Sequence, residues 1–400
     1  MAGLRVLDLT RILAGPTCTQ LFGDMGAEIL KIERPGGGDD TRKWGPPFVK
    51  DADGADTEES AYYLCANRNK KSVAVNLADP RGAALIRSLL DHCDVLMENF
   101  KVGGLKAYGL SYDDLKESHP KLIYCSITGY GQTGPNKDKP GYDVMAQGYG
   151  GIMSLTGAPD GEPMKVGVGI ADVVCGLYAG NAILAALRHR DRTGMGQHID
   201  LSLVDTQISW LINEGTNYLT SGTAPLRRGN AHPNIVPYQT FQTSNGHAIV
   251  AVGNDSQYQR FCAVIGRPDL ADDPRFATNT NRLSAREELV PLIAEAVRLI
   301  DTETLLSELA TAKVPAGPVH TLPEVFETDQ VAAREMKISM PHPKAGSGTV
   351  DLIGNPIKFS ETPVTYRHAP PVCGGDTDAV ITDLLGSAAL EAAKADGIVG

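Results

Sequence analysis

The stretch RVLDLTRILAGPTCTQLFGDMGAEILKIE (5–33) predicts a strand, a helix and a second strand in succession. RVLDL (5–9) is a candidate buried strand, and EILKIE (28–33) predicts another. Between them, PTCTQLFGDMG (16–26) has apolar residues at helical spacing and ends at a glycine. Strands that alternate with helices are typical of parallel sheets with crossover helices.

The same alternation continues over the first 200 residues. Residues 61–77 predict a helical turn and a strand, and residues 79–94 predict a helix capped by Asp79 with Pro80 at its first position. Further predicted strands cover 95–100 and 121–131, a short helix covers 111–120, and a long apolar helix begins near Asp172. We therefore predict an α/β fold with a large, Rossmann-like parallel sheet. Ligands of such sheets bind in loops after strand ends, here TRILAGP (10–16), IERPGGGDDTR (32–42) and ENFKVGG (98–104).

The second half predicts a smaller unit. HAIVAVGN (247–254) predicts a strand, and residues 255–266, 284–300 and 301–314 predict helices. The predicted organisation is a large α/β domain over 1–205, a linker over 206–228, a small domain over 229–325, a second linker over 326–345 and a return to the large domain over 346–400. Residues 376–386 predict a final helix, and the last dozen residues are expected to fray.

The composition excludes several classes. The net charge of −11 disfavours binding of nucleic acid or of an anionic membrane surface by the chain as a whole. The seven cysteines are scattered without a CxxC pair, which predicts reduced thiols in a cytoplasmic compartment and no zinc site. We expect no signal peptide, and no apolar run reaches the roughly 18 residues that a membrane span needs.

Familiar catalytic motifs are missing. The turn after the first strand contains neither GxGxxG nor GxxxxGK[ST], which disfavours a dinucleotide or P-loop site. The sequence has no GxSxG elbow, and its nine histidines have no HExxH spacing, so no metal is predicted.

Basic residues follow several predicted strands. Gathered at one edge of the sheet, they would favour a phosphorylated ligand such as coenzyme A, although solvated surface charge is the ordinary alternative. These residues are Arg11, Arg34, Arg42, Arg68, Lys70, Lys71, Lys101 and Lys106.

Asp172 precedes the long apolar helix and allows two interpretations. Aspartate is a favoured N-cap, so a structural role suffices to explain it. The same position also suits a nucleophile, because a helix N-terminus favours an ionised carboxylate and its N–H groups can stabilise an oxyanion.

Taken together, the motifs resemble the class III CoA-transferases, the CaiB/BaiF family, over about residues 1–386. The matching stretches are VLDLTRILAGP (6–16), GDMGAEILKIERPGGGDDTR (23–42), NRNKKSVAVNL (67–77), ENF (98–100), CSITGYGQTGP (125–135), GYDVMAQGYGGIMSLTG (141–157), GVGIADVVCGLYAGNAILAAL (167–187), TGMGQHIDLSL (193–203) and GNAHPNIVPYQTF (229–241). The resemblance implies a large α/β domain with a smaller inserted α+β domain, and an interlocked homodimer.

The resemblance also implies covalent catalysis by Asp172. The carboxylate would attack an acyl-CoA to give an aspartyl anhydride, and the CoA thiolate would return to give an aspartyl-CoA thioester that the acceptor acid attacks. Coenzyme A is thus a co-substrate, and no permanently bound cofactor is expected. The residues implied to bind coenzyme A are Arg34, Asn69, Lys70, Asn99, Phe100, Lys106 and Tyr142. Those implied to bind the acid are Arg11, Leu13, Gly15, Arg228 and His232.

Some positions distinguish branches of this family. Tyr142 stands where the related α-methylacyl-CoA racemases have a histidine, and a phenol is a poor base near neutral pH, so transfer is favoured over racemisation. Leu13 replaces a glutamine of formyl-CoA:oxalate transferases. The whole pattern looks closest to succinyl-CoA:dicarboxylate enzymes, including those acting on glutarate, with Arg11, Arg227 or Arg228 as the cation for a distal carboxylate.

Overall fold

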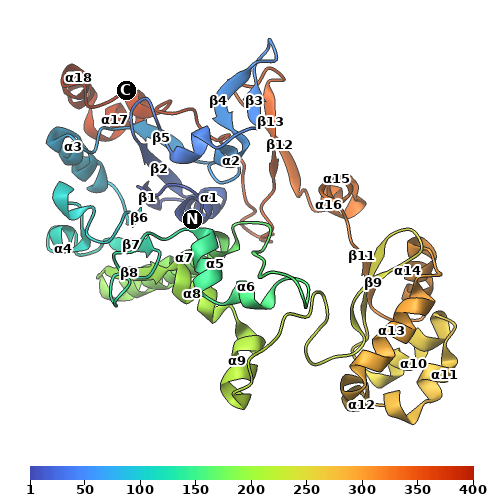
Figure 1. The fold of residues 1–400 in the computed structure, drawn as a ribbon. Helices are drawn as coiled ribbons and strands as arrows, with labels where there is room; N and C mark the ends of the chain where they lie inside the picture. The colour runs from blue at the N-terminus through green and yellow to red at the C-terminus, as the bar shows by residue number, and fades with distance from the viewer. The chain divides into compact units, whose positions relative to one another are not determined.

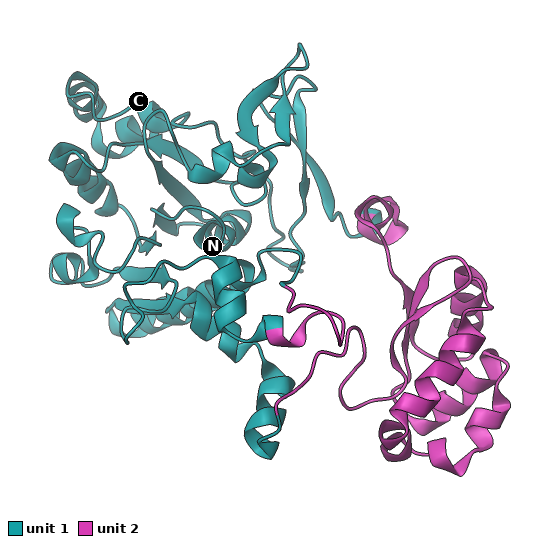
Figure 2. Ribbon diagram, in the orientation of Figure 1, with its two compact units in different colours: residues 1–153, 165–223, 332–400 teal, residues 154–164, 224–331 magenta.

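The computed structural model describes residues 1–400 and divides into two compact units (Figure 2). Unit 1 comprises residues 1–153, 165–223 and 332–400, and unit 2 comprises residues 154–164 and 224–331. Each unit has its own buried apolar core.

A six-stranded parallel sheet forms the centre of unit 1 (Figure 1). The sheet order is β5-β2-β1-β6-β7-β8, and every neighbouring pair is parallel. Counted along the chain, this is the strand order 3-2-1-4-5-6 of doubly wound Rossmann sheets. It confirms the predicted parallel α/β sheet. The strands are β1 (Arg5–Asp8), β2 (Glu28–Glu33), β5 (Lys71–Ala74), β6 (Val95–Glu98), β7 (Ile123–Thr128) and β8 (Gln197–Ser202).

Helices cover both faces of this sheet because successive strand residues point to opposite sides. Val6, Ile29 and Val95 pack in one core cluster, whereas Leu7 and Leu30 pack in the other. The first cluster includes α1 (Ala14–Asp24), α5 (Asp143–Tyr149), α7 (Ile170–Thr193) and α8 (Leu203–Ser209). The second includes α3 (Pro80–Leu90), α4 (Tyr112–Leu115), α17 (Thr377–Leu385) and α18 (Ser387–Ala395).

Unit 1 also contains two antiparallel hairpins that the sequence patterns did not predict. They are β3 (Phe48–Lys50) with β4 (Asp56–Ser60), and β12 (Lys337–Pro341) with β13 (Thr349–Ile353). Its remaining short elements are η1 (Asp40–Lys43), η2 (Lys106–Tyr108), α2 (Ala61–Leu64), α6 (Ile152–Leu155), which reaches into unit 2, and α9 (Ile212–Ser221).

Unit 2 packs helices against a three-stranded antiparallel sheet of order β11-β10-β9. The strands are β9 (Tyr238–Gln242), β10 (His247–Ala251) and β11 (Ala316–Pro318). The helices are α10 (Asp255–Val264), α11 (Pro268–Asp272), η3 (Pro274–Phe276), α12 (Asn279–Ser284), α13 (Arg286–Val297), α14 (Thr302–Thr311), α15 (Leu322–Glu327) and, at the unit boundary, α16 (Asp329–Ala333). The segments predicted as linkers, 206–228 and 326–345, contain regular structure, including α9 and β12.

The C-terminal segment differs from the prediction. The last dozen residues were expected to fray, but α18 continues to Ala395, and Ala393 and Ile398 are buried in the core. The backbone N–H of Asn76 donates to the carbonyl of Ile398 at 2.8 Å. The prediction was wrong because the partners of this segment lie more than 300 residues earlier in the chain.

Helix α7 is long and apolar enough to cross a membrane by length and composition alone, with a window of mean hydropathy 1.7. Half of that window is buried within the fold. Ala171, Cys175 and Ile183 pack in the same core cluster as α1 and the sheet. These contacts mark α7 as a core helix of unit 1.

Candidate functional site

The strand order of the sheet reverses at β1, between β2 and β6, and ligands of open α/β sheets bind outside the carboxyl ends of the strands at such a point. Two loops meet there, one after β1 and one after β6. Asn99 joins them, because its Oδ1 accepts from the backbone N–H of Arg11 at 3.0 Å and its Nδ2 donates to the Arg11 carbonyl at 2.7 Å. The Arg11 guanidinium lies 5.8 Å from the centre of the Phe100 ring.

Two adjoining cavities line this edge, and we call them together the switch-point groove. They share Arg11, Asp40 and Phe100. The first, of about 310 Å³, is lined also by Arg34, Asn76 and Tyr108. The second, of about 330 Å³, reaches Asp172 and is lined also by Asn99, Lys101, Lys137, Lys139, Tyr142 and Asp143. Volumes of this size are within the range of small-molecule sites.

Asp172 lies in the first turn of α7 and is 8% exposed. The prediction that it caps the helix was wrong, because the N-cap is Gly169. Asp143 of α5 takes the capping role instead: its Oδ1 accepts from the N–H groups of Ala171 at 2.8 Å and Asp172 at 3.3 Å. The same bonds occupy two N–H groups that were expected to serve as an oxyanion site.

Burial, and next the nearby Asp143 charge, raise the pKa of Asp172 to about 7. The protein donates no hydrogen bond to its carboxylate. Asp143 is held in place because its Oδ2 accepts from Nε2 of Gln147 at 2.7 Å. A carboxyl group in a cleft whose pKa is shifted by burial and a like charge is typical of a functional site.

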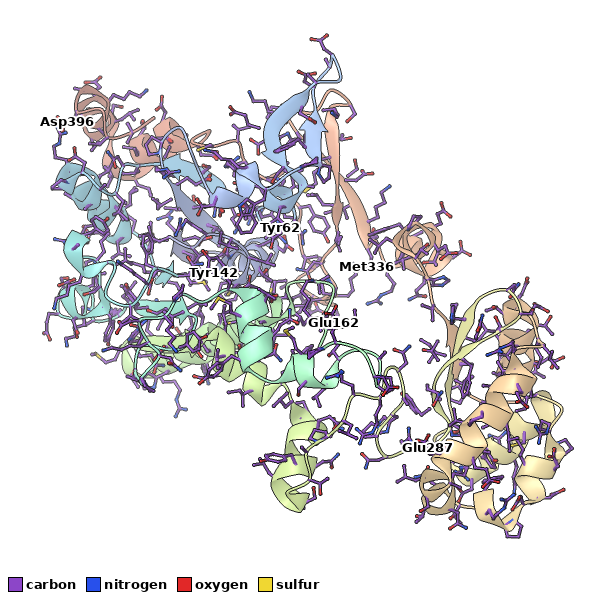
Figure 3. All side chains as sticks on the ribbon, viewed as in Figure 1. Tyr62, Tyr142, Glu162, Glu287, Met336 and Asp396 are labelled. Atoms are coloured by element: carbon purple, nitrogen blue, oxygen red, sulfur yellow. The ribbon has the colours of Figure 1, made fainter.

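Tyr62 was not among the predicted site residues. Burial, and next the charge of Asp172, raise the pKa of Tyr62 to about 12, so its phenol stays protonated and able to donate. Figure 3 labels Tyr62 and Tyr142, which lie on unit 1 in α2 and at the N-cap of α5. The sequence signal for Tyr62 was weak, because it stands in an apolar turn, AYYL (61–64).

The groove is lined by cations and carboxylates in equal number: Arg11, Lys31, Arg34, Lys101, Lys137 and Lys139 against Glu33, Asp39, Asp40, Asp138, Asp143 and Asp172. Arg11 pairs with Asp40 at 2.6 Å, and both side chains are more than two-fifths exposed. Arg34 is exposed at one end of the groove. Lys106 is also exposed and belongs to η2, whose Tyr108 lines the groove. Lys137 and Lys139, which the sequence analysis missed, come from NKDK (136–139), just before the matching GYD motif. No histidine lines either cavity.

Asn69 and Lys70 do not line the groove. Asn69 is buried with a φ of 58°, donates to Asp24 and Thr365, and accepts from two backbone N–H groups. Lys70 is fully buried and donates to Asp8, Pro16 and Asn67. The structure does not support the expected binding role, because these bonds occupy the polar atoms of both side chains.

Three other predicted cations also form ion pairs. Arg42 pairs with Glu33 and Glu59 at 2.8 Å each, Arg68 with Asp24 at 2.6 Å and Lys71 with Glu28 at 2.6 Å. Arg68 and Lys71 belong to NRNKK (67–71), which leads into the amino end of β5. The expected gathering of all these cations at one edge was therefore wrong.

Leu13 is the N-cap of α1, at the end of the loop after β1, and Gly15 lies in the first turn of α1. A Cβ on Gly15 would lie 2.4 Å from Thr10, so close packing requires the glycine, whereas a Cβ on Gly169 would lie 3.1 Å from Leu13. Neither Leu13 nor Gly15 lines the cavities.

Arg228 and His232, together with Arg227, belong to unit 2. Arg227 donates to the carbonyls of Ala158 and Gly161, and Nδ1 of His232 accepts from the N–H of Asn234. Neither of the predicted residues, Arg228 and His232, lines the groove in unit 1. No group of three or more His, Cys, Asp or Glu side chains is placed to hold a metal ion.

Comparisons with known proteins show which family the chain resembles. The chain is 47% identical to a succinate–glutarate CoA-transferase of Agrobacterium fabrum, over 96% of this chain and 95% of that protein. It is 41% identical to a succinyl-CoA:glutarate CoA-transferase of Mus musculus, over 96% and 86%. Among solved structures, a CaiB/BaiF family protein from Brucella suis matches with a TM-score of 0.85 and 46% identity, over 96% of this chain and 98% of that one.

The family model described as CoA-transferase family III matches residues 1–377. This match covers unit 2, unit 1 up to residue 377 and the whole switch-point groove. The resemblance inferred from the motifs is confirmed: the chain belongs to the CoA-transferase family III and is an enzyme of that family.

Proposed function

We propose that this enzyme moves coenzyme A from succinyl-CoA to a small dicarboxylic acid, with Asp172 as the covalent nucleophile. One observation carries the mechanism: the buried Asp172 carboxylate accepts no hydrogen bond from the protein and lines, together with Arg11, Lys101, Lys137 and Lys139, a groove at the switch point of the sheet. The substrates are taken from relatives that are 41–47% identical to this chain and named for succinate and glutarate.

Coenzyme A lies along the groove in this proposal. Its phosphates bind at the Arg34 end, where Lys106 is near through η2, and its pantetheine arm passes Phe100 and Asn99 toward Asp172. Arginine and lysine are the usual partners of phosphate groups. The thioester then lies beside the buried carboxylate, where water is partly excluded.

The reaction proceeds by four acyl exchanges at the Asp172 carboxyl group. Ionised Asp172 attacks the thioester carbonyl of succinyl-CoA, the C–S bond breaks, and an aspartyl–succinyl anhydride and the CoA thiolate form. The thiolate attacks the aspartyl carbonyl, which releases succinate and leaves an aspartyl-CoA thioester. The acceptor carboxylate attacks this thioester to give a mixed anhydride and the thiolate, and the thiolate then attacks the acceptor's acyl carbon and restores Asp172.

Groups near Asp172 position the nucleophile and bind the acceptor acid during these steps. Asp143 orients the first turn of α7 through its bonds to Ala171 and Asp172. Two N–H groups at the start of α7 are bonded to Asp143, so they are not free to stabilise the developing oxyanion. Lys101, Lys137 or Lys139, together with Arg11, supply cations for the acceptor's distal carboxylate.

A cytoplasmic homodimer is the proposed state of the enzyme. Unit 1 exposes large apolar side chains on three helices, a pattern that marks surfaces for protein association. They are Val144, Met145 and Tyr149 of α5, Leu177, Tyr178 and Leu184 of α7, and Ile212, Tyr218 and Leu219 of α9. Sedimentation equilibrium on the purified chain tests this state, and a monomer at micromolar concentration would contradict it.

The nucleophile is tested by mass spectrometry. The enzyme is mixed with succinyl-CoA without an acceptor acid and is then digested. We expect CoA to be bound covalently to the peptide that contains Asp172. Asp172→Ala should lose the adduct and at least about 10⁴-fold of the transfer rate, as expected for removal of a nucleophile. Asp191→Ala serves as the matched control, since Asp191 is exposed near the other end of α7.

The acceptor is identified in the same assay with a panel of C4 to C6 dicarboxylates and matched monocarboxylates. We expect dicarboxylates to be converted at least tenfold faster. Full transfer by Asp172→Ala would disprove the mechanism. Deuterium uptake at the α carbon of a 2-methylacyl-CoA, without acid exchange, would instead support an acyl-CoA racemase.

A further inference from the structure

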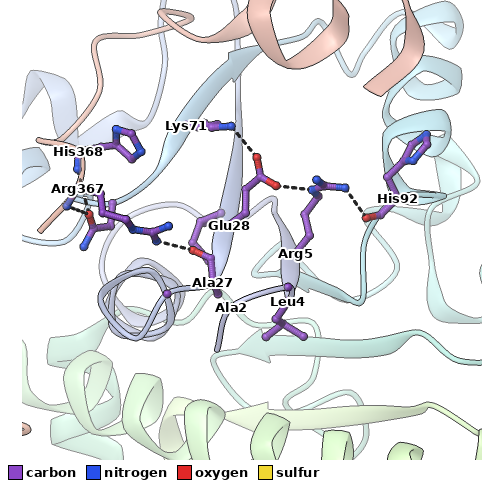
Figure 4. Close-up of a pocket in the computed structure, with 13 residues that line it drawn as sticks. Ala2, Leu4, Arg5, Ala27, Glu28, Lys71, His92, Arg367 and His368 are labelled. Carbon is purple, nitrogen blue, oxygen red and sulfur yellow. Dashed lines mark hydrogen bonds and ion pairs between the residues drawn. The ribbon is translucent and has the colours of Figure 1, made fainter. Parts of the chain in front are cut away.

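Another cavity, separate from the two of the switch-point groove, lies at the opposite edge of the parallel sheet from Asp172. It has a volume of about 360 Å³ and lies entirely within unit 1. Leu4 and Arg5 open β1, Glu28 opens β2, and Lys71 opens β5, so the cavity is at the amino ends of the strands. We call it the amino-edge pocket; Figure 4 shows its lining.

The lining is cationic in a chain of net charge −11. Arg5, Lys71 and Arg367 carry positive charges, His92 and His368 add two imidazoles, and Glu28 is the one carboxylate among the lining residues. Three fixed positive charges against one negative charge leave the pocket with an excess of positive charge.

Glu28 lies between two of these cations. Its Oε2 accepts from Nε of Arg5 and its Oε1 from Nζ of Lys71, each at 2.6 Å. Burial acts to raise the pKa of Glu28, but the bonds to Lys71 and Arg5 outweigh burial and hold the pKa below its usual value. All three side chains remain about a quarter to a third exposed, so solvent and small ions reach them.

Arg367 has no carboxylate partner. One of its terminal nitrogens donates to the carbonyls of Gly23 and Ala27, at 2.8 and 2.9 Å, which fixes the guanidinium beside the cavity. Backbone carbonyls orient the group but do not neutralise its charge. A fixed guanidinium with remaining N–H donors is suited to bind a carboxylate or phosphate group.

We propose that the amino-edge pocket is a second binding site, distinct from the switch-point groove, for a small dianion. The carboxylate or phosphate oxygens of the dianion bind Arg367 and Lys71. They compensate part of the positive charge that Glu28 otherwise compensates alone. This inference rests on the charges and geometry of the pocket and not on the proposed transfer reaction.

The test uses the full chain carrying Arg34→Gln, so that phosphate binding in the groove is weakened. Inorganic phosphate and succinate are titrated separately by calorimetry, with ionic strength held constant by sodium chloride. We expect saturable binding of at least one anion, and the anion whose binding the pocket variants change identifies the class of ligand. Lack of saturable binding by both anions overturns the proposal.

Two pocket variants with opposite expected effects follow in the same background. Lys71→Gln should weaken binding about tenfold, because it removes a charged donor. Glu28→Gln should tighten it severalfold, because it removes the competing carboxylate; misfolding would not produce a gain. Lys337→Gln is the matched control, since Lys337 pairs with Asp351 on β12–β13 and does not line the pocket. Binding that neither pocket variant changes also overturns the proposal.

Discussion

Asp8 and Asp172 are both buried carboxylates of unit 1, yet their surroundings differ in every respect. Asp8 accepts from the N–H of Thr10 at 2.9 Å, from Thr19 at 2.6 Å and from Lys70 at 3.4 Å. Burial acts to raise the pKa of Asp8, but the charges of Lys70 and Lys31 and these bonds hold it below its usual value. Asp172 has no such donors, and its pKa is about 7.

The comparison distinguishes a carboxylate that stabilises the fold from one that is available to react. Asp8, Lys31, Asp39 and Lys70 form a buried ion-pair network in which Lys31 pairs with Asp39 at 2.8 Å. Its members hold the loops after β1 and β2 in place, and each is committed to a partner. Asp172 is fixed by its backbone alone, so its carboxylate stays available to a substrate.

The largest expected effect on stability comes from breaking the buried ion-pair network. Lys70→Met leaves Asp8 buried beside fewer positive charges, and losing one partner of a buried pair costs about 3–5 kcal/mol. Urea denaturation should show this loss, and Lys50→Met, which removes an exposed pair with Asp56, should show almost none. Unchanged stability with weakened acyl-CoA binding would instead restore the binding role expected from the sequence.

Replacing Asp172 is expected to raise the free energy of unfolding, by less than replacing Lys70 lowers it. Between about pH 4 and pH 7 the unfolded chain releases this proton while the folded chain keeps it, so stability falls as pH rises through that window. Asp172→Asn removes the titrating group and should stabilise the protein at pH 8 by on the order of 2 kcal/mol.

Scanning calorimetry at pH 5 and pH 8 measures this effect. The difference in Tm between Asp172→Asn and the parent should grow toward pH 8, while Asp191→Asn should show no such trend. A variant less stable than its parent at pH 8 would mean that the ionised carboxylate has stabilising partners in the fold.

The proposed position of coenzyme A in the groove is tested by replacing Arg34. Arg34→Gln should raise the KM for acyl-CoA about tenfold and leave kcat within about twofold, since the residue lies far along the groove from Asp172. The difference should shrink as salt concentration rises, because the guanidinium is exposed. Lys337→Gln is the control for loss of one surface cation, and an unchanged KM would contradict the proposed position of coenzyme A.

The smallest effect is expected from replacing Asp143, and it is a shift in the pH profile of kcat/KM. Ionised Asp172 is the reactive form, so kcat/KM should rise with pH through about 7. Asp143→Asn removes a like charge and should move this rise to lower pH by less than about one unit, because burial is the larger cause of the shift. Asp143→Glu keeps the charge and should restore the original profile; a shift toward higher pH in Asp143→Asn would contradict the assignment.

Local patterns predicted the elements that local forces determine. β2 has the bounds that its apolar run predicted, and Asp79 caps α3 by accepting from the N–H of Arg81 at 2.9 Å, with Pro80 at the first helical position. The loops after β1 and β6 meet at the groove, as expected of parallel strands. The hairpin β3–β4 escaped prediction because its strands carry little apolar alternation, whereas β12 and β13 alternate but are only five residues long each.

The errors at the site share one physical cause, which is the distance along the chain between partners. Asp143 caps a helix that begins 27 residues later, so Asp172 alone suggested the cap. Asn69 bonds to Arg367 and His368, almost 300 residues away, and nothing near Asn69 in the sequence indicates that its amide is occupied. Motif resemblance pointed to Asp172 as the proposed nucleophile, but the hydrogen-bond partners of each side chain required the structure.

The late return of the chain to unit 1 has a consequence for how the protein is made. Val380, Ile381 and Ile398 complete the core around β2 and β5, and Asp376 and Thr377 accept from backbone N–H groups of β5. On the ribosome, residues 224–331 of unit 2 emerge before these residues exist. Unit 2 therefore has the chance to fold first, while the part of the sheet face that residues 376–398 cover, beside β2 and β5, stays exposed until those residues are made.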